Sequence, residues 1–366
     1  MKKVQIIIIG AGIVGMNISY LLQKRNINHI IVDKNKTLLN NASGAAGAFV
    51  SPIYNTKSPI GTMLQTAFSF ASKFYEDFSN CVDKGIVHLG ANETEPPAYD
   101  TPFEKVLLYG RAGYLLQDAL VIDPVQLVAE LNKNAPIVLD EKVTSLEYIS
   151  DGWCMNEKIW CEKVIMTSGY ETELIEEEYI DLRGVSGVKI KIHSNSPMLH
   201  NGQEDIFFSK SHHGEIIIGA THHRTALNEK IIEKDTQALI AKWQQITGNR
   251  DAALVEQKTG IRACSKDYFP IVGQIIDAQK TLALHPSIYH GTKISNDKVV
   301  HKNNLHICSG VGGKGYTWAP YLAHILVNNL FSHQKIPSTL NIYSRFLRYY
   351  RKNKLVLVKR ESNCVT

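Results

Sequence analysis

A glycine-rich turn between an apolar strand and a helical segment constrains this chain more than any other feature. Residues 4–9 are almost entirely apolar, which is typical of a parallel strand buried on both faces. Gly10, Gly12 and Gly15 follow at GxGxxG spacing, and residues 13–25 have helical periodicity. The first glycine allows a tight turn, the second a close approach to a pyrophosphate, and the third close helix packing. The segment therefore predicts a βαβ unit that binds a dinucleotide.

An acidic residue in the expected place supports this interpretation. The next predicted strand, residues 28–32, ends in Asp33, where such sites hold a ribose hydroxyl pair. Glycines at this spacing also serve ordinary turns, but here the strand, glycines, helix, strand and acid occur in the required order. Residues 40–52 are rich in small side chains, so they form either a loop close to a bulky ligand or a flexible surface loop.

Size and composition limit the class of protein. The 366 residues suggest roughly two domains, and the 44% hydrophobic content excludes wholesale disorder. The net charge of +5 is mildly basic and does not by itself indicate a nucleic-acid partner. The six cysteines lack zinc spacing, and no signal peptide or membrane-spanning segment is visible. We therefore expect a cytoplasmic protein with reduced thiols, no membrane association and no metal.

The periodicity changes along the chain. Helices are expected at 62–80, at 124–131 with Asp123 as the cap, at 228–247 and at 320–331, strands at 138–149, 153–160, 163–167 and 305–309, and an exposed loop at 91–102. Residues 187–193 and 205–220 alternate with a period near two, which indicates an antiparallel region. We predict a two-domain α/β (α+β) fold in which an antiparallel-sheet substrate domain interrupts a Rossmann-like domain. The limits are 1–85, 120–185 and 256–340 for the Rossmann-like domain, 86–119 and 186–255 for the substrate domain, and 341–366 for a basic tail.

Seven segments, in order, resemble the D-amino-acid oxidase/glycine oxidase family of FAD enzymes over essentially the whole chain. They are GAGIVG from Gly10, ASGAAG from Ala42, VIMTSGY from Val164, RGVSGVKI from Arg183, GEIIIGATHH from Gly214, GIRACSKDYFPIVG from Gly260 and SGVGGKGYTWAP from Ser309. Within the family, the chain is most similar to the FAD-dependent oxidase domain of bifunctional enzymes that modify the tRNA wobble uridine. The resemblance implies FAD as the cofactor and oxidation of an amine, with molecular oxygen as a possible electron acceptor.

The resemblance also assigns the cofactor site. The candidate FAD-binding residues are Gly10, Gly12, Ile13, Val14, Gly15, Asp33, Lys34, Ala42, Ser43, Gly44, Gly47, Val143, Ser168, Gly169, Arg262, Gly312, Gly313, Lys314 and Gly315. In such enzymes the flavin takes a hydride from the amine, and the imine then hydrolyses, so no dedicated acid or base is required.

Two residues are candidates for the chemistry itself. Lys314, in the glycine cluster before the last helix, would stabilise negative charge on the reduced flavin; the alternative is an ordinary glycine-rich turn. Arg262 would hold a substrate carboxylate with its planar fork; the alternative is a structural ion pair with Asp267. The glycine oxidase branch has an arginine in its terminal glycine loop, and Gly313 stands at the aligned position here. This difference disfavours free glycine as the substrate.

The end of the chain is basic and aromatic. From Tyr343 onward a single acid, Glu361, accompanies Arg345, Arg348, Arg351, Lys352, Lys354, Lys359 and Arg360. Such a segment either contacts RNA or forms a solvated amphipathic helix. The resemblance implies that the protein oxidises the carboxymethylaminomethyl group of tRNA wobble uridine, releasing glyoxylate. The alternatives are oxidation of a free small amine, such as glycine, sarcosine or a D-amino acid, and a non-catalytic flavin-containing protein.

Two histidine pairs flank a predicted strand. His212 and His213 precede it, and His222 and His223 follow it. Histidine is a common metal ligand, but no carboxylate or cysteine joins these pairs at ligand spacing. We therefore predict no metal site here.

Overall fold

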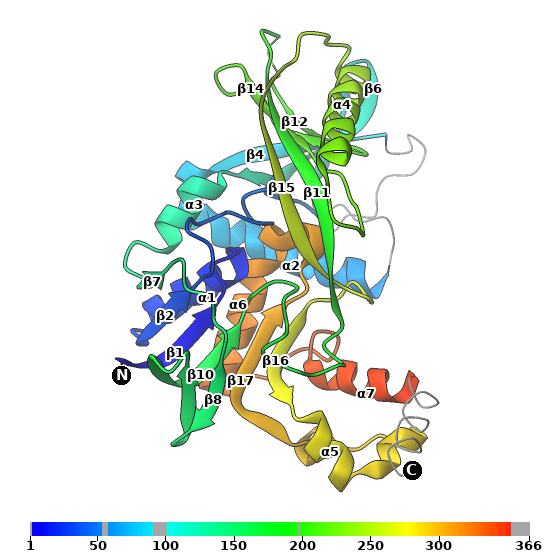
Figure 1. Cartoon of the computed structure of the whole chain (residues 1–366). Helices are drawn as coiled ribbons and strands as arrows, with labels where there is room; N and C mark the ends of the chain where they lie inside the picture. Colours follow the sequence, from blue (N-terminus) through cyan, green and yellow to red (C-terminus); the bar gives the residue numbers. More distant parts are fainter. Residues whose placement is uncertain (1, 53–57, 91–100, 197, 353–366) are drawn as a thin grey trace.

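The computed structural model of the chain describes residues 2–52, 58–90, 101–196 and 198–352. Most of the predicted loop 91–102 and the tail residues after Lys352 lie outside these ranges. The described residues form two β-sheets with helices packed against them, so the α/β fold class expected from the sequence is confirmed (Figure 1).

The first sheet contains the strands of the predicted dinucleotide-binding unit. Within the described ranges its eight strands are β1 (Lys2–Ile9), β2 (His29–Val32), β7 (Ile137–Val138), β8 (Leu146–Ile149), β9 (Gly152–Met155), β10 (Ile159–Met166), β16 (Ile271–Ile276) and β17 (His301–Ser309). In the order β16-β17-β10-β1-β2-β7, all neighbours are parallel except β16 and β17. The hairpin of β8 and β9 pairs with β10.

The apolar run of β1 is explained by burial on both faces. Ile6 and Ile8 belong to one hydrophobic core, and Ile7 and Ile9 belong to another. Because successive side chains of a strand point to opposite faces, a strand covered on both sides needs apolar residues at every position.

Helices supply the cover on the two faces of the first sheet. They are α1 (Ile13–Lys24), α2 (Pro59–Tyr75), α3 (Pro124–Leu131), α5 (Ala278–Leu284), α6 (Gly315–Ser332) and α7 (Ile342–Lys352). Helices α1, α2 and α6 pack together in the core that contains Ile6, whereas α7 packs on β16 and buries Phe346 in the other core. The predicted cap of α3 is confirmed, because Asp123 accepts hydrogen bonds from the amides of Val125 and Gln126.

The second sheet is mostly antiparallel. Its nine strands in the described part are β3 (Phe49–Val50), β4 (Val82–Leu89), β5 (Phe103–Leu108), β6 (Arg111–Ile122), β11 (Leu182–His193), β12 (Asn201–Gln203), β13 (Phe207–Phe208), β14 (Glu215–Gly219) and β15 (Ala253–Ser265). One pair, β12 and β4, is parallel. Helix α4 (Glu229–Thr247) covers this sheet, and Trp243 is fully buried between them. The two long strands β11 and β15 run from this sheet toward the first (Figure 1).

Two helix limits differ from the sequence predictions. The helix expected over 62–80 is α2 followed by a 3₁₀ segment, Glu76–Cys81. The helix expected to begin at Pro320 begins at Gly315, with Pro320 inside it. Proline favours the first turn of a helix because it lacks an amide N–H. Here the carbonyl that Pro320 cannot bond, that of Tyr316, accepts a hydrogen bond from the buried hydroxyl of Tyr75 instead.

The limits of the two predicted domains remain a prediction. Strands β3 and β15, most of which fall in ranges assigned to the Rossmann-like domain, pair in the second sheet. The first part of the predicted tail is helix α7, which packs on the core. Among the described residues, no helix is both long and apolar enough to cross a membrane.

Candidate functional site

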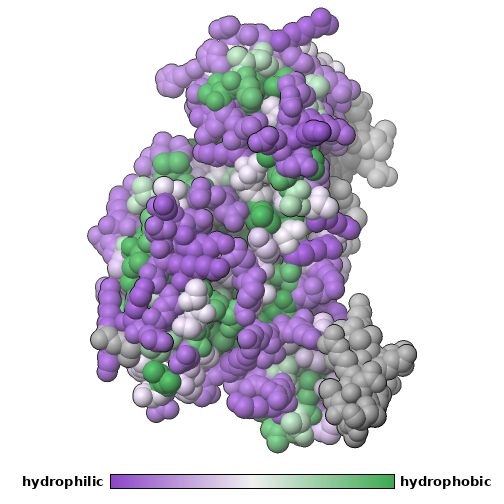
Figure 2. Space-filling model, in the orientation of Figure 1, coloured by the Kyte–Doolittle hydropathy of each residue, from purple (hydrophilic) through white to green (hydrophobic). Residues whose placement is uncertain are grey.

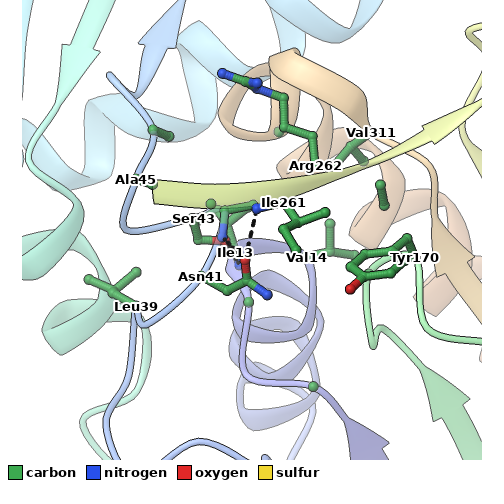
Figure 3. A pocket seen from close by; sticks show the side chains of 18 of the residues that line it. Ile13, Val14, Leu39, Asn41, Ser43, Ala45, Tyr170, Ile261, Arg262 and Val311 are labelled. Carbon is green, nitrogen blue, oxygen red and sulfur yellow. Dashed lines mark hydrogen bonds between the residues drawn. The ribbon is translucent and has the colours of Figure 1, made fainter. Parts of the chain in front are cut away.

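A cavity of about 900 Å³ is lined by both sheets (Figure 3). The carboxyl ends of β1, β2 and β10 contribute to it from the first sheet, and residues 203–207, 219, 220, 222 and 260–263 contribute from the second. Ligands of open α/β sheets bind outside the carboxyl ends of the strands. The volume lies in the upper part of the range usual for ligand sites, about 300–1,000 Å³.

Most of the residues predicted to bind the cofactor line this cavity. They are Gly10, Gly12, Ile13, Val14, Asp33, Lys34, Ala42, Ser43, Gly47, Val143, Ser168, Gly169, Arg262, Gly312, Gly313, Lys314 and Gly315. Gly15 and Gly44 do not line it. A Cβ atom at Gly15 would lie 2.1 Å from the carbonyl oxygen of Gly10, and one at Gly44 would lie 1.8 Å from that of Leu39. These two glycines therefore permit close packing of chain segments.

Asp33 is placed to receive hydroxyl groups at the end of β2. Its Oδ2 accepts a hydrogen bond from the amide of Ala11 at 2.7 Å, and its Oδ1 accepts from the amide of Asn35 at 2.8 Å. These bonds fix the carboxylate beside the glycine turn. Oδ1 also accepts from Nδ2 of Asn35 at 2.8 Å. Since a carboxylate accepts about four hydrogen bonds, capacity for about one remains for a ligand hydroxyl.

The segment of small residues, 40–47, is held firmly against the cavity. Ser43 accepts a hydrogen bond from the amide of Ile13 at 3.0 Å through Oγ, and its carbonyl accepts from the hydroxyl of Tyr316 at 2.9 Å. Asn41 accepts through Oδ1 from the amide of Ile261 at 2.9 Å (Figure 3). The composition of this segment left open a loop close to a ligand or a flexible surface loop. The structure shows a loop that lines the cavity.

Lys189 holds the same segment from the second sheet, and the sequence did not single it out. Its ammonium donates a hydrogen bond to the carbonyl of Gly44 at 2.9 Å. The side chain is buried, and the loss of hydration lowers its pKa to about 8. A lysine in an alternating strand pattern gives no sign of such a contact, because its partner lies far away in the sequence.

Lys314 lies in the cavity wall beside polar neutral groups. Its Nζ donates a hydrogen bond to Oγ of Ser51 at 3.1 Å, and that hydroxyl lies 3.2 Å from Oε1 of Gln203. Desolvation lowers the pKa of Lys314 to about 8. Within the described ranges no ion pair is found for Lys314. Its charge is therefore available to an anionic group in the cavity.

Arg262 lies in a similar setting on β15. Its Nη1 donates a hydrogen bond to the carbonyl of Thr221 at 3.0 Å, and burial lowers its pKa. The alternative of an ion pair with Asp267 is wrong, because that carboxylate pairs with Arg345 at 2.8 Å and with Arg348. In the part of the chain that the structure describes, Arg262 has no acidic partner.

The second histidine pair is divided between the cavity and helix α4. His222 lines the cavity, where desolvation and the neighbouring charge of Arg262 lower its pKa. His223 instead approaches Asp235, with Nε2 2.7 Å from Oδ2. No cluster of metal-ligating side chains occurs in the described ranges.

These residues fit a flavin dinucleotide. The turn at Gly10 has φ +112°, and a Cβ there would lie 2.5 Å from the carbonyl oxygen of Thr167, so only glycine fits. The amino end of α1, whose cap residue is Gly12, faces the cavity and suits a pyrophosphate. Asp33 suits a ribose, and Lys314 suits a group that gains negative charge.

Comparison with known families gives a match over most of the chain. The model of the family described as FAD dependent oxidoreductase (DAO) matches residues 5–329.

Similar proteins include two curated bacterial relatives, each a tRNA 5-methylaminomethyl-2-thiouridine biosynthesis bifunctional protein MnmC. The protein of Campylobacter fetus is 27% identical over 353 residues, which are 89% of this chain and 56% of that protein. The protein of Leptospira borgpetersenii is 25% identical over 360 residues, 84% of this chain and 54% of that protein. The chain thus spans about half the length of the curated relatives it matches.

A solved structure has the same fold. Glycine oxidase from Geobacillus kaustophilus superimposes with a TM-score of 0.70 and 17% sequence identity, covering 92% of this chain and 96% of that chain. At this identity the likeness concerns the fold alone.

Proposed function

This chain belongs to the DAO family of FAD-dependent oxidoreductases, and on that premise we propose that it oxidises the C–N bond of an N-substituted glycine. Its cofactor is FAD, and it is an amine-oxidising enzyme. The amine that enters the cavity, and the residues that hold it there, are the subject of the proposal.

The desolvated guanidinium of Arg262 carries the proposal. Guanidinium groups remain charged in proteins, and a desolvated charge without a partner is costly. No carboxylate of the described residues pairs with Arg262, whereas the carboxylate of an N-substituted glycine would. Because a guanidinium binds a carboxylate through two parallel hydrogen bonds, Arg262 would also orient the adjacent C–N bond.

The other side chains have distinct tasks in this proposal. The amides around Gly12 hold the pyrophosphate, and Asp33 holds the ribose. When bound, FAD supplies the site that accepts the hydride from the amine. Ser51 fixes the ammonium of Lys314, whose positive charge would stabilise negative charge on the reduced flavin. Substrate oxidation thus needs no side chain that abstracts a proton.

We assign the tRNA wobble uridine as the carrier of this glycine unit. Its carboxymethylaminomethyl group would be cleaved to the aminomethyl base and glyoxylate, in the cytoplasm. Two observations support the assignment. The curated relatives are named for tRNA 5-methylaminomethyl-2-thiouridine biosynthesis. In addition, Gly313, where the glycine oxidase branch has arginine, leaves space next to Arg262: a Cβ there would lie 3.9 Å from Cδ of Arg262.

Flavin bleaching under anaerobic conditions tests the proposal. The protein is mixed with glycine, with sarcosine, and with tRNA that carries the carboxymethylaminomethyl group, and tRNA nucleosides are then analysed by mass spectrometry. We expect bleaching by the tRNA and conversion to the aminomethyl form. An Arg262→Lys variant keeps the positive charge but loses the two parallel N–H donors of the guanidinium, so its flavin should bleach more slowly. Efficient bleaching by glycine or sarcosine with unchanged tRNA would assign a free-amine oxidase instead, and bleaching by none of them would indicate a non-catalytic flavin.

A further inference from the structure

A buried carboxylate on α4 is bonded to the segment that precedes this helix. Asp235 is 8% exposed and lies on the helix face toward the second sheet. Its Oδ2 accepts a hydrogen bond from the hydroxyl of Thr221 and lies 2.7 Å from Nε2 of His223. No lysine or arginine of the described residues pairs with it. Since a buried carboxylate is costly unless it is well bonded, these two contacts account for its presence in the core.

The segment bonded by Asp235 is also pinned to β11. The amide of Val188 donates a hydrogen bond to Oγ1 of Thr221 at 3.0 Å. The amides and carbonyls of Ser186 and His223 exchange two hydrogen bonds, both of 2.8 Å. Residues 221–223 therefore run as an extended strip between α4 and β11.

Successive side chains of this strip point alternately toward helix α4 and toward the cavity. The side chains of Thr221 and His223 face Asp235, whereas His222 between them lines the cavity. The carbonyl of Thr221 accepts the hydrogen bond from Nη1 of Arg262 at 3.0 Å. The guanidinium is thus bonded directly to the backbone of the strip.

Gly187 on β11 allows the carbonyl of Thr221 and the guanidinium of Arg262 to lie close to this strand. A Cβ at Gly187 would lie 2.2 Å from the carbonyl oxygen of Thr221 and 2.5 Å from Nη1 of Arg262. The carbonyl and the guanidinium therefore both lie against the backbone of β11. Asp235 bonds the strip from its other side.

We propose that Asp235 is a positioning residue for substrate binding, which holds residues 221–223 so that Arg262 and His222 meet the carboxylate end of the substrate. The inference rests on the proposed function, in which Arg262 receives that carboxylate. Asp235 does not line the cofactor cavity. Its loss should therefore weaken binding of the carboxylate and leave FAD binding intact.

Titration of the FAD-loaded protein with (methylthio)acetate, the carboxylate CH3–S–CH2–COO⁻, tests this role. The compound has sulfur where N-methylglycine has nitrogen, so it brings the carboxylate without being oxidised as an amine, and the flavin absorption reports binding. We expect Asp235→Ala to raise its Kd by about tenfold, because a guanidinium that is no longer held in place loses part of its charge-assisted hydrogen bonds to the carboxylate. Asp235→Asn, which keeps an acceptor oxygen, should restore most of the affinity.

A matched control separates positioning from simple destabilisation of α4. Asn228 caps this helix, accepting a hydrogen bond from the amide of Ile231 at 3.0 Å. Asn228→Ala should destabilise the helix without touching the strip. Its Kd for (methylthio)acetate should stay at the wild-type value. Equal weakening in Asn228→Ala, or a wild-type Kd in Asp235→Ala, would overturn the proposal.

Crystal structures of the wild type and Asp235→Ala give a readout that needs no ligand. We expect the hydrogen bond between Nη1 of Arg262 and the carbonyl of Thr221 to be lost in the variant. If the bond persists unchanged, the positioning role is refuted. If the wild type binds no carboxylate but the bond is lost in the variant, the proposed function fails and the structural coupling stands.

Discussion

The hydroxyl of Tyr75 donates a hydrogen bond of 2.9 Å to the carbonyl of Tyr316, the acceptor that Pro320 leaves without a partner inside α6. Tyr316 in turn donates through its own hydroxyl to the carbonyl of Ser43 at 2.9 Å. One tyrosine on α2 therefore supports the helix whose first turn holds the small-residue segment against the cavity.

Removal of the Tyr75 hydroxyl should destabilise the protein. Tyr75 is fully buried, so Tyr75→Phe leaves the carbonyl of Tyr316 without a donor and without water. An unsatisfied buried polar group costs about 1–3 kcal/mol. We expect a lower Tm in thermal unfolding of the variant, whereas Tyr148→Phe, on the exposed hairpin, should leave it unchanged. Equal Tm values for wild type and Tyr75→Phe would mean that the hydrogen bond contributes nothing.

This relationship explains one limit of prediction from the sequence. Proline usually marks the first turn of a helix, so the pattern placed the start of the last core helix at Pro320. The true start at Gly315 depends on a donor 241 positions away along the chain. Local rules cannot supply that donor, because only the packing of α2 on α6 brings it into place.

The buried ammonium of Lys314 should make stability depend on pH. Desolvation lowers its pKa from an ordinary value of 10.5 to about 8 in the folded protein. Between these values the unfolded chain binds the additional proton, so stability increases as pH rises through this window. Below pH 8 the full cost is present, on the order of 3 kcal/mol.

Lys314→Met tests this dependence in the FAD-free protein. We expect the variant to have the higher free energy of unfolding at pH 7, and the difference should shrink as pH rises from 8 toward 10.5. Denaturant unfolding at several pH values measures it. A difference that does not change with pH would show that Lys314 keeps its ordinary pKa. With FAD bound, the same variant should be reduced more slowly by substrate, since it lacks the stabilising charge.

Loss of the Asp33 carboxylate should weaken FAD binding. Asp33→Ala removes the acceptor at the end of β2, and a hydrogen bond to a charged group contributes about 1.5–3 kcal/mol. The Kd for FAD should therefore rise by one to two orders of magnitude, as quenching of flavin fluorescence would measure. Asp33→Asn, which keeps an acceptor for the amide of Ala11, should show a smaller effect. An unchanged Kd in Asp33→Ala would mean that Asp33 does not reach the ribose.

The sequence predicted the cofactor end of the cavity far better than its other end. The glycine turn and Asp33 lie within one βαβ unit, so their spacing alone indicates their geometry. Ser51, which neighbours Lys314, directly follows β3, and Gln203, which is next to Ser51, lies on β12. No spacing rule connects these positions in the sequence. The contact between Arg262 and Thr221 could not be predicted either. Thr221 accepts this hydrogen bond through its backbone carbonyl, which every residue has, so the side-chain pattern does not indicate it.

The last prediction concerns the basic end of the chain. Arg345 is 11% exposed and bonded to Asp267, so it belongs to the core rather than to a contact surface. Arg348, although paired with the same carboxylate, is 44% exposed, and Arg351 is exposed on the same helix. With tRNA as the proposed substrate, we expect this surface to contact its phosphates. Arg348→Gln with Arg351→Gln should then weaken tRNA binding and reduce its salt dependence by about one unit of slope for each lost phosphate contact, because each contact releases counterions. The control is Lys230→Gln with Lys234→Gln, which removes the same charge from the exposed face of α4. Filter binding over a range of salt concentrations compares the two double variants. A matching loss in both would show that overall charge, and not α7, governs tRNA affinity, and no loss in either would remove α7 from the tRNA contact.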